Sequence, residues 1–460
     1  MTSVTSSAPP AARAPLFPLG RIVQVSTLAL AFLLPSLTWL DTAGAALLAL
    51  LFNLFILPQL DVDRSTDFLA QDSTAAAARE HGGTAGLILY PVSVLLLILS
   101  YRRHLDIVAA AWALMALGDP AAALAGRTLG ERRLPWNQRK TWAGSLAFVL
   151  AGGAGAYTLT RWLNPTLPAD RTLLISALAA LLGAAVESAP IGLDDNLTVP
   201  LVCGGFLYCA GLVERSAFDS NFPFLPRRLL LALAVNLAFA LMALGLKAAS
   251  RSGAALGFAL GVLVYLAWGW KSFLVLFCFF LLGSAATRLG YARKAERGVA
   301  ERSGGARSWR EALANVAPGA FFAALAITTH HERAFLLAFV AAFAEAAGDT
   351  VSSEIGQWLS PHAYLITTLR RVAAGEDGAL SAAGSAAGLA ASALVAALAF
   401  VLGLASPGGA ALAFGAAAAG NLFDSLLGAT LERQGLLTNG AVNFAGTSLA
   451  GALALAVALR

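Results

Sequence analysis

The chain has 460 residues, of which 58% are hydrophobic and only 12% are charged, and its mean hydropathy is +0.72. Soluble domains contain about 45–50% apolar residues, glycine included, so this composition excludes a soluble globular protein. The formal net charge is +5, and the three cysteines lie in apolar stretches whose spacing indicates no disulfide, zinc or redox motif. We predict an all-α, polytopic integral membrane protein whose partners include the lipid bilayer and no nucleic acid.

Apolar stretches of about 15–25 residues, each with no charge or one acid, recur along the chain after a Ser-, Ala- and Pro-rich tail at 1–20. The tail lacks the apolar region of a signal peptide, so we interpret it as disordered. Each stretch is near the length that crosses the hydrocarbon core of a bilayer, and together they predict about fifteen transmembrane helices. Two short stretches, 172–186 and 334–348, are candidates for half-helices that line a cavity. The predicted helices lie at 22–40, 42–60, 82–101, 107–126, 141–160, 172–186, 196–213, 229–246, 252–270, 272–287, 312–329, 334–348, 379–404, 410–430 and 435–459.

The distribution of Lys and Arg predicts the orientation of these helices. If the tail is cytoplasmic and every predicted span crosses, most of the 31 Lys and Arg residues fall in cytoplasmic loops, as the positive-inside rule requires. The same orientation brings the loops that are dense in acids, Arg, Gly and Asn to that side. We therefore expect a bacterial inner-membrane protein whose active sites face the cytoplasm.

A pattern of glycine and aspartate occurs once in each half of the chain. Gly-Asp at 118–119 is followed by Gly126, and Gly-Asp at 348–349 is followed by Gly356, at identical offsets. The basic loop at 288–310 divides the chain, either as a solvated loop that fixes topology or as a phosphate-binding rim. We predict two tandem membrane domains with one active site each, at 21–228 and 229–460.

Acids, cations and glycines gather near these two patterns. An acid inside a membrane span costs roughly 2.5–3.5 kcal/mol on insertion scales, so a cation, a metal or a water-filled cavity is expected beside it. Phosphoryl transfer from a nucleotide requires carboxylates for a divalent metal, cations for the phosphates and glycines where backbone amides approach them. The candidate Mg²⁺ ligands are Asp119, Glu187, Asp194 and Asp195 in the first half and Asp349, Glu354 and Asp424 in the second. The candidate phosphate-binding cations are Arg127 and Lys140 in the first half and Arg302, Arg307, Arg370 and Arg371 in the second.

The double acid at 194–195 has a second interpretation. Aspartates at a helix start cap the backbone N–H groups of the first turn, and the next predicted helix begins near Asn196. A pair of acids close to Glu187 also suits a divalent metal. Both interpretations remain open from the sequence.

Three motifs occur in order in the first half: REHGG at 79–83, GDPAAALAGRTLGERRLPWNQRKTWAGS at 118–145 and VESAPIGLDDNLTVPL at 186–201. They resemble the phytol kinase branch of the dolichol kinase and cytidylyltransferase-related membrane family. The resemblance implies transfer of a phosphoryl group, typically from CTP, to an isoprenoid alcohol. Within these motifs we assign Asp119 and Lys140 as catalytic, and we add three residues to the nucleotide- and phosphate-binding set: Arg79, Gly126 and Ser145.

The second half carries RSWREALANV at 307–316, AGDTVSSEIG at 347–356, a turn from Gly375 to Gly384 and GNLFDSLLGATLE at 420–432. These segments resemble the membrane family that includes phytyl-phosphate kinase. We assign Asp349 and Asp424 as catalytic and add Asn315 and Gly356 to the nucleotide- and phosphate-binding set. Together the two resemblances imply a fusion that phosphorylates an isoprenoid alcohol to its monophosphate and then to its diphosphate.

Two other classes of protein share part of this pattern. A nucleotidyltransferase similar to CDP-lipid synthases would use the same acids and lysine. A secondary transporter would use repeats and half-helices at the middle of the membrane. The acids of this chain are predicted at one face of the membrane, which favours the kinase over the transporter.

Overall fold

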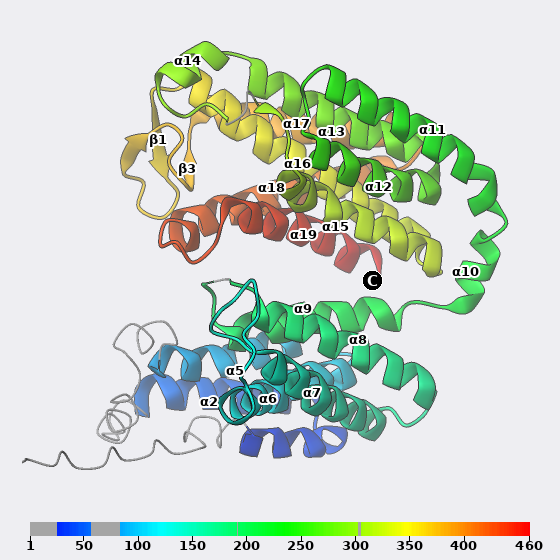
Figure 1. The fold of residues 1–460 in the computed structure, drawn as a ribbon, viewed down its shortest axis with the longest axis vertical. Coiled ribbons are helices and arrows are strands. Elements are labelled where there is room, and N and C mark those ends of the chain that lie inside the picture. The colour runs from blue at the N-terminus through cyan, green and yellow to red at the C-terminus, as the bar shows by residue number, and fades with distance from the viewer. Residues whose placement is uncertain (1–24, 57–82, 191, 302–304) are drawn as a thin grey trace, which may run out of the picture. The chain divides into compact units, whose positions relative to one another are not determined.

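The structure is a computed structural model that describes residues 25–56, 83–190, 192–301 and 305–460 (Figure 1). Nearly all of its elements are helices. The elements up to residue 211 are η1 Leu28–Ser36, α2 Trp39–Leu51, η2 Phe52–Ile56, α5 Gly83–Ser100, α6 Leu105–Thr128, α7 Trp142–Leu163, α8 Ala169–Ser188 and α9 Asp195–Gly211. The later elements are α10 Arg215–Asn221, α11 Phe224–Gly245, α12 Arg251–Trp268, α13 Trp270–Arg288, α14 Tyr291–Glu296, α15 Trp309–Thr328, α16 Glu332–Leu359, β1 His362–Leu365, β2 Arg371–Ala373, β3 Ala379–Leu380, α17 Ala382–Val401, α18 Pro407–Leu427, η5 Gly428–Glu432 and α19 Asn439–Ala458.

The predicted class of an all-α polytopic membrane protein is confirmed, and the predicted number of spans changes. Within the described ranges, twelve helices are long and apolar enough to cross a membrane, against about fifteen predicted. The described residues of the stretches at 22–40, 82–101 and 196–213 form helices that do not meet that length and hydropathy on their own. The prediction of half-helices at 172–186 and 334–348 is wrong, because α8 has 20 residues and α16 has 28.

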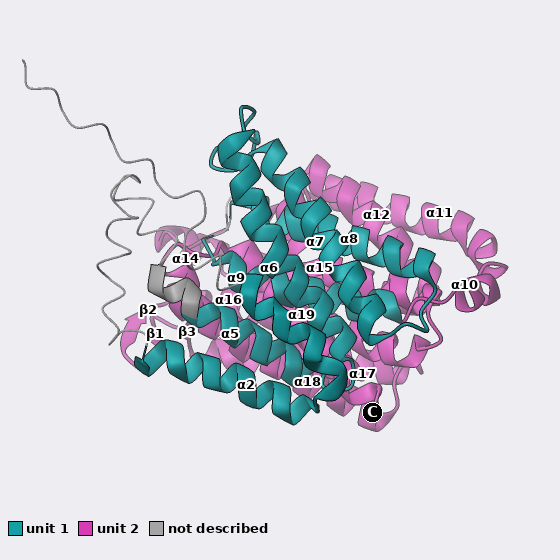
Figure 2. Cartoon of the chain, turned by 90° about the horizontal axis from the view of Figure 1, so that it is seen from below, with its two compact units in different colours: residues 1–211 teal, residues 212–460 magenta. Residues whose placement is uncertain are grey.

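The chain divides into two compact units, Met1–Gly211 and Leu212–Arg460 (Figure 2). The sequence placed the boundary between residues 228 and 229, which lies inside α11. The short helix α10 belongs to the second unit because it is bonded to the end of α15: Asn221 Nδ2 donates a hydrogen bond of 3.0 Å to the carbonyl oxygen of Ile327.

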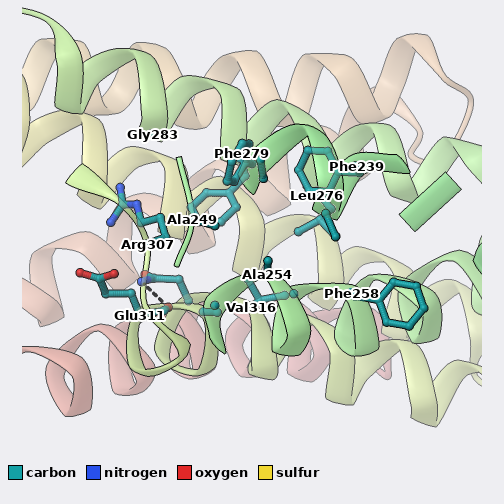
Figure 3. Close-up of a pocket in the computed structure, with 17 residues that line it drawn as sticks. Phe239, Ala249, Ala254, Phe258, Leu276, Phe279, Gly283, Arg307, Glu311 and Val316 are labelled. Carbon is teal, nitrogen blue, oxygen red and sulfur yellow. Dashed lines mark hydrogen bonds between the residues drawn. The ribbon is translucent and has the colours of Figure 1, made fainter. Parts of the chain in front are cut away.

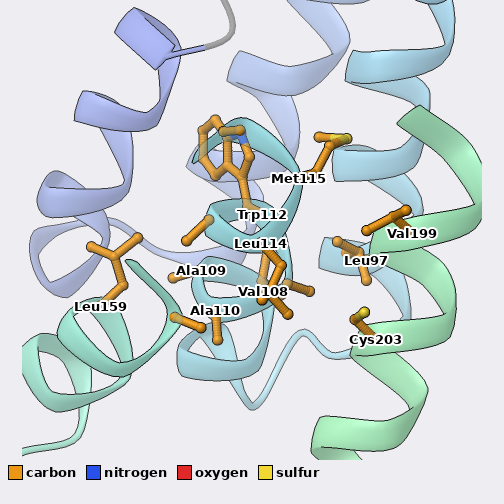
Figure 4. Close-up of a cluster of buried hydrophobic side chains, with 14 of the residues drawn as sticks. Leu97, Val108, Ala109, Ala110, Trp112, Leu114, Met115, Leu159, Val199 and Cys203 are labelled. Carbon is orange, nitrogen blue, oxygen red and sulfur yellow. The ribbon is translucent and has the colours of Figure 1, made fainter. Parts of the chain in front are cut away.

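The core of the first unit surrounds α6 (Figure 4). Every residue at 108–116 is buried, and five of these nine residues are alanines. Glycines bring α6 and α7 together: a Cβ at Gly118 would lie 2.7 Å from the ring of Phe148, and a Cβ at Gly144 would lie 2.9 Å from the carbonyl oxygen of Ala122. This close packing fixes the position of the residue that follows Gly118.

In the second unit α16 is the central helix, and α13, α15, α17, α18 and α19 pack against it. Small residues line its seam with α17: a Cβ at Gly388 would lie 2.7 Å from the carbonyl oxygen of Gly348, and a Cβ at Gly384 would lie 2.5 Å from that of Ser352. Such small-residue contacts are typical of helix packing in membranes. These contacts fix α16 against α17 and so fix the positions of the acids on α16 relative to α17.

A three-stranded antiparallel sheet of order β2-β1-β3 follows α16, and the all-α prediction did not include it. β1 pairs with β2 through His362 and Ala373, and with β3 through Tyr364 and Leu380. The turn before β3 requires glycine at residue 378, which has a φ of +69° and packs against the backbone where α18 ends. The sheet is thereby held beside the C-terminal ends of α16 and α18.

Candidate functional site

The first unit brings three predicted acids together from three helices. Asp119 lies on α6, Glu187 is the penultimate residue of α8, and Asp195 is the first residue of α9. Each offers one carboxylate oxygen to a group in which all the oxygens lie within 4.8 Å of one another. Within the described part of the chain, this is the one group of three or more metal-ligating residues with that spacing.

Lys140 lies between two of these carboxylates. Its Nζ donates to Glu187 Oε1 at 2.5 Å and to Asp195 Oδ2 at 2.9 Å. Burial lowers the pKa of Lys140, and the adjacent carboxylates of Asp195 and Glu187 more than offset that effect, so its pKa is raised above its ordinary value. The lysine is therefore a fixed positive charge at this site at neutral pH.

The basic turn before α7 holds Lys140 in place. Its carbonyl oxygen accepts a hydrogen bond of 3.0 Å from the backbone N–H of Leu134, a buried residue. The next residue, Thr141, pairs with Arg133 in an isolated bridge and caps α7, because its side-chain oxygen accepts from Gly144 N–H at 3.0 Å. The lysine is thus positioned by the turn rather than by a long flexible loop.

The three carboxylates fit a magnesium ion. Mg²⁺ binds oxygen at about 2.0–2.1 Å in octahedral geometry, so its ligand oxygens lie roughly 3–4.2 Å apart. The three carboxylate oxygens lie within 4.8 Å of one another, which is close to this spacing. Asp119, Glu187 and Asp195 are the residues that would hold the ion.

Asp194 is not in this group. Its Oδ1 accepts a hydrogen bond of 2.8 Å from the backbone N–H of Asn196, so it caps the start of α9. The two interpretations of the double acid therefore divide between the residues: Asp194 caps the helix and Asp195 faces the other carboxylates.

The other residues proposed for the first site are not part of the group of three carboxylates. Arg127 is exposed near the end of α6, and Gly126 faces Thr141, whose Oγ1 would lie 3.2 Å from a Cβ at residue 126. Ser145, one turn into α7, has a buried Oγ with no hydrogen-bond partner among the described residues. Arg79 lies outside the described residues.

The second unit contains a polar cavity of about 270 Å³ at the N-terminal ends of α15 and α19 and the C-terminal ends of α16 and α18, with the sheet and its turns on one side. Asp349, Asp424 and Asn315 line it. Its acidic lining residues are Glu301, Glu311, Asp349, Glu354, Glu376, Asp377, Asp424 and Glu432. Arg307 is the one cation in the described lining, so the cavity is strongly acidic.

Glu345 is an acid that the sequence analysis missed. It is fully buried near the middle of α16, one turn before Asp349, and its Oε2 accepts a hydrogen bond of 2.7 Å from Thr447. Its other oxygen, Oε1, and Asp424 Oδ2 are buried without a hydrogen-bond partner in the described structure. The available signal was an acid in the middle of a predicted span, which is a functional hypothesis by default.

Glu354, a predicted metal ligand, is engaged elsewhere. Its Oε2 accepts a hydrogen bond of 2.5 Å from Lys294 Nζ, and both side chains are buried. The lysine also donates to the carbonyl oxygens of Ala286 at 3.1 Å and Thr287 at 2.8 Å. This complete set of partners ties α14 and the end of α13 to α16.

Arg307 and Asn315, two residues predicted to bind nucleotide or phosphate, line the cavity. The backbone of Arg307 is fixed between two helix starts: its N–H donates to Ala248 at 2.9 Å, and its carbonyl oxygen accepts from Ser250 at 2.9 Å. Arg307 Nη2 and Asn315 Oδ1 are buried and lack hydrogen-bond partners among the described residues. Both groups are therefore available to a ligand.

The remaining residues proposed for the second site differ in their distance from the cavity. Arg370 and Arg371 are exposed at the turn into β2 and are not among the described lining residues. Gly356 lines the cavity and also packs against Gly384. Arg302 lies outside the described residues.

Comparison with protein families matches residues 234–452 to the family described as integral membrane protein DUF92. The chain is 37% identical over 206 residues to the uncharacterized membrane protein sll0875 of Synechocystis sp., which covers 43% of this chain and 78% of that protein. It is 36% identical over 213 residues to the chloroplastic protein VTE6 of Arabidopsis thaliana, covering 45% of this chain and 64% of that protein.

The chain is also similar to proteins named as phytol kinases, as the sequence resemblance predicted. It is 32% identical over 122 residues to a probable chloroplastic phytol kinase of Triticum aestivum, a match that covers 25% of this chain and 41% of the wheat protein. No solved structure matches the chain. From the extent of its similarity to the Synechocystis protein and its match over 234–452, the chain belongs to the integral membrane protein family DUF92.

Proposed function

We propose that this protein is a membrane kinase that phosphorylates an isoprenoid alcohol, such as phytol or geranylgeraniol, to its monophosphate in the first unit and to its diphosphate in the second. CTP is the proposed phosphoryl donor and Mg²⁺ the proposed metal. The observation that carries the proposal is the grouping of Asp119, Glu187 and Asp195, two of which bond Lys140, in a membrane helical bundle. The relatives named as phytol kinases support the choice of acceptor.

In the first unit the arrangement suits phosphoryl transfer. Such a transfer has a loose transition state with charge spread over the phosphoryl oxygens, so catalysis rests on positioning and charge neutralisation. Bound Mg²⁺ would neutralise the phosphates of the nucleotide. Lys140 is held by the same turn that begins α7 and supplies a fixed cation to the transferred group. The alcohol oxygen bonds to the γ-phosphorus, the bond to the β–γ bridging oxygen breaks, and CDP and the hydroxyl proton leave.

In the second unit the acidic cavity supports a second site of the same chemistry. A nucleotide has the same sign of charge as this lining, so it would enter with divalent cations rather than alone. Asp349 and Asp424 carry carboxylates on the cavity wall, and Arg307 faces the cavity with a free N–H group. The proposed acceptor there is an isoprenyl monophosphate.

The test uses the purified full chain in nanodiscs with Mg²⁺ and CTP labelled at the γ-phosphate, with phytol, geranylgeraniol or farnesol as acceptor. Label is expected in both monophosphate and diphosphate lipids, and it should disappear when EDTA replaces Mg²⁺. A parallel reaction with CTP labelled at the α-phosphate should leave the lipid unlabelled. Label from the α-phosphate in the lipid would instead identify a nucleotidyltransferase. The absence of lipid label from either nucleotide would contradict both the kinase and the nucleotidyltransferase.

We further propose that both sites face the cytoplasm of a bacterial inner membrane. The proposal rests on the distribution of Lys and Arg along the chain and on the cytoplasmic supply of nucleotides. Labelling of single cysteines introduced next to Lys140 and Arg307, with a membrane-impermeant maleimide in oriented vesicles, tests it. Reaction only from the cytoplasmic side is expected.

A further inference from the structure

A second cavity lies directly beside the polar cavity of the second unit. It has a volume of about 70 Å³ between α11, α12, α13 and α15. A single water requires roughly 10–15 Å³ of such space, so the cavity has room for a run of several atoms. Arg307, Glu311 and Asn315 line both cavities and form the wall that they share.

The rest of the second cavity is apolar. Apart from the three shared residues, its lining consists of Phe239, Ala240, Ala243, Ala249, Gly253, Ala254, Gly257, Phe258, Leu276, Phe279, Phe280, Gly283, Ala312 and Val316. Figure 3 shows Arg307 and Glu311 at one end of it and Phe258 at the other, with Phe279 between them. We call this apolar cavity the slot.

Aromatic rings give the slot firm walls. Phe239 of α11 contacts Phe280 of α13 edge to face, with ring centroids 4.9 Å apart. Phe279 is buried and contacts Phe343 of α16 at 5.7 Å. Such contacts add to the stability that burial gives, so the slot is a built feature of the packing between these helices.

Glycines on α12 keep the slot open. Gly253 packs directly against the carbonyl oxygen of Arg307 at the polar end. Gly257 is one turn further along, about 6 Å away by the rise of an α-helix, and a Cβ there would have no heavy atom within 4 Å. Nothing in the packing of the described residues therefore requires glycine at 257, and a Cβ at this lining position of the slot meets open space.

The polar end of the slot offers groups to an anion. Arg307 Nη2 is buried and has no hydrogen-bond partner among the described residues. Glu311, the acid beside it, is engaged in its own helix start, where its Oε2 accepts a hydrogen bond of 2.5 Å from Ser308 N–H. A free guanidinium N–H at the junction of a polar and an apolar cavity matches a ligand with an anionic head and an apolar tail.

We infer that the slot binds the first isoprene units of an isoprenyl monophosphate, with its phosphate at Arg307 facing the acidic cavity. This inference rests on the proposed function, because the monophosphate is the acceptor proposed for the second unit. It adds a substrate subsite made by α11, α12, α13 and α15. The carboxylates of Asp349 and Asp424 lie on the other side of the shared wall, where the nucleotide would bind.

The test compares Gly257→Leu, which fills the slot, with Gly415→Leu as its matched control. Gly415 is a mid-helix glycine of α18 that is exposed and has no heavy atom within 4 Å of its Cβ position. Each protein is photolabelled in nanodiscs with geranylgeranyl monophosphate that carries a diazirine in its second isoprene unit. The wild type and Gly415→Leu should be labelled on α12 and α13, and Gly257→Leu should lose at least nine tenths of that label.

An activity measurement adds a chain-length comparison. In Gly257→Leu the KM for the twenty-carbon monophosphate should rise at least tenfold, whereas the KM for a five-carbon monophosphate, which ends before residue 257, should stay unchanged. Label on other helices, or equal labelling and equal KM values in the two variants, would contradict the assignment of the slot as a substrate subsite, even if the kinase activity is present. Displacement of the label by lysophosphatidic acid as readily as by unlabelled probe would overturn its assignment to isoprenyl chains. Label in the slot without any kinase activity would contradict the proposed function and leave the slot standing.

Discussion

Glu345 and Asp424 lie on different helices and each turns a buried carboxylate oxygen toward Gly446 on a third. A Cβ at Gly446 would lie 2.6 Å from Glu345 Oε1 and 3.3 Å from Asp424 Oδ2. Neither oxygen has a hydrogen-bond partner in the described structure. Burial of two carboxylate oxygens close to the same position costs free energy unless a proton or a cation binds between them. Glycine at residue 446 therefore keeps space for the proton or cation.

Gly446→Ala tests the importance of this space. The added methyl should displace the Glu345 carboxylate, because it would lie only 2.6 Å from Glu345 Oε1. Diphosphate formation from supplied monophosphate is expected to fall at least tenfold. The free energy of unfolding should fall by less than about 3 kcal/mol, because overpacking costs about 1–3 kcal/mol and the helix preference of alanine offsets up to about 1 kcal/mol of that cost. Gly440→Ala, in the same helix with its nearest neighbour at 3.9 Å, is the control. Equal activity in the two variants would remove Glu345 from the site.

Lys140→Met should abolish the first phosphorylation. The change removes the cation that bonds Glu187 and Asp195, and loss of one stabilising donor to a transition-state charge typically costs about 10²–10³ in kcat. Lys140→Arg keeps the charge with a different geometry and should retain part of the activity. The measurement is monophosphate formed from geranylgeraniol, with diphosphate formation from supplied monophosphate as the internal control. Unchanged monophosphate synthesis by the methionine variant would exclude the assigned role.

The buried pair of Lys294 and Glu354 predicts a difference in stability. Lys294→Met leaves the Glu354 carboxylate buried without its cation, a loss that typically costs about 3–5 kcal/mol. Exchange of both residues, Lys294→Met with Glu354→Met, removes both charges and should recover most of that loss. The free energy of unfolding in mixed micelles, measured for both single variants and the double variant, gives the coupling between the two residues. Additive losses would mean that the pair contributes nothing as a pair.

The sequence predicted the helices well because each apolar stretch must bury its backbone hydrogen bonds within itself. Every predicted stretch carries a described helix, and α8 and α16 extend beyond the predicted stretches because charged residues continue both helices. The sheet after α16 was missed because its strands have only two to four residues.

The candidate sites could be predicted only in part. Asp119, Glu187 and Lys140 stood out because charges near membrane spans are rare, and the structure brings them together. Asp194 caps α9 and Asp195 faces the other carboxylates because α9 begins at Asp195. A helix start one residue earlier or later would change both roles, so the two aspartates could not be told apart from the sequence. The pairing of Glu354 with Lys294 joins residues 60 apart, and no local pattern encodes such a contact.

The most direct test of two sites with separate tasks is a product analysis of Asp119→Asn and Asp349→Asn, each supplied with geranylgeraniol or with its monophosphate and labelled CTP. Asp119 lies in the carboxylate group of the first unit, and Asp349 lines the acidic cavity of the second. Asp119→Asn is expected to make no monophosphate while it converts supplied monophosphate to diphosphate at the wild-type rate. Asp349→Asn should accumulate monophosphate from the alcohol and form no diphosphate from either substrate. Loss of both steps in both stably inserted variants, or retention of diphosphate synthesis by Asp349→Asn, would contradict this account.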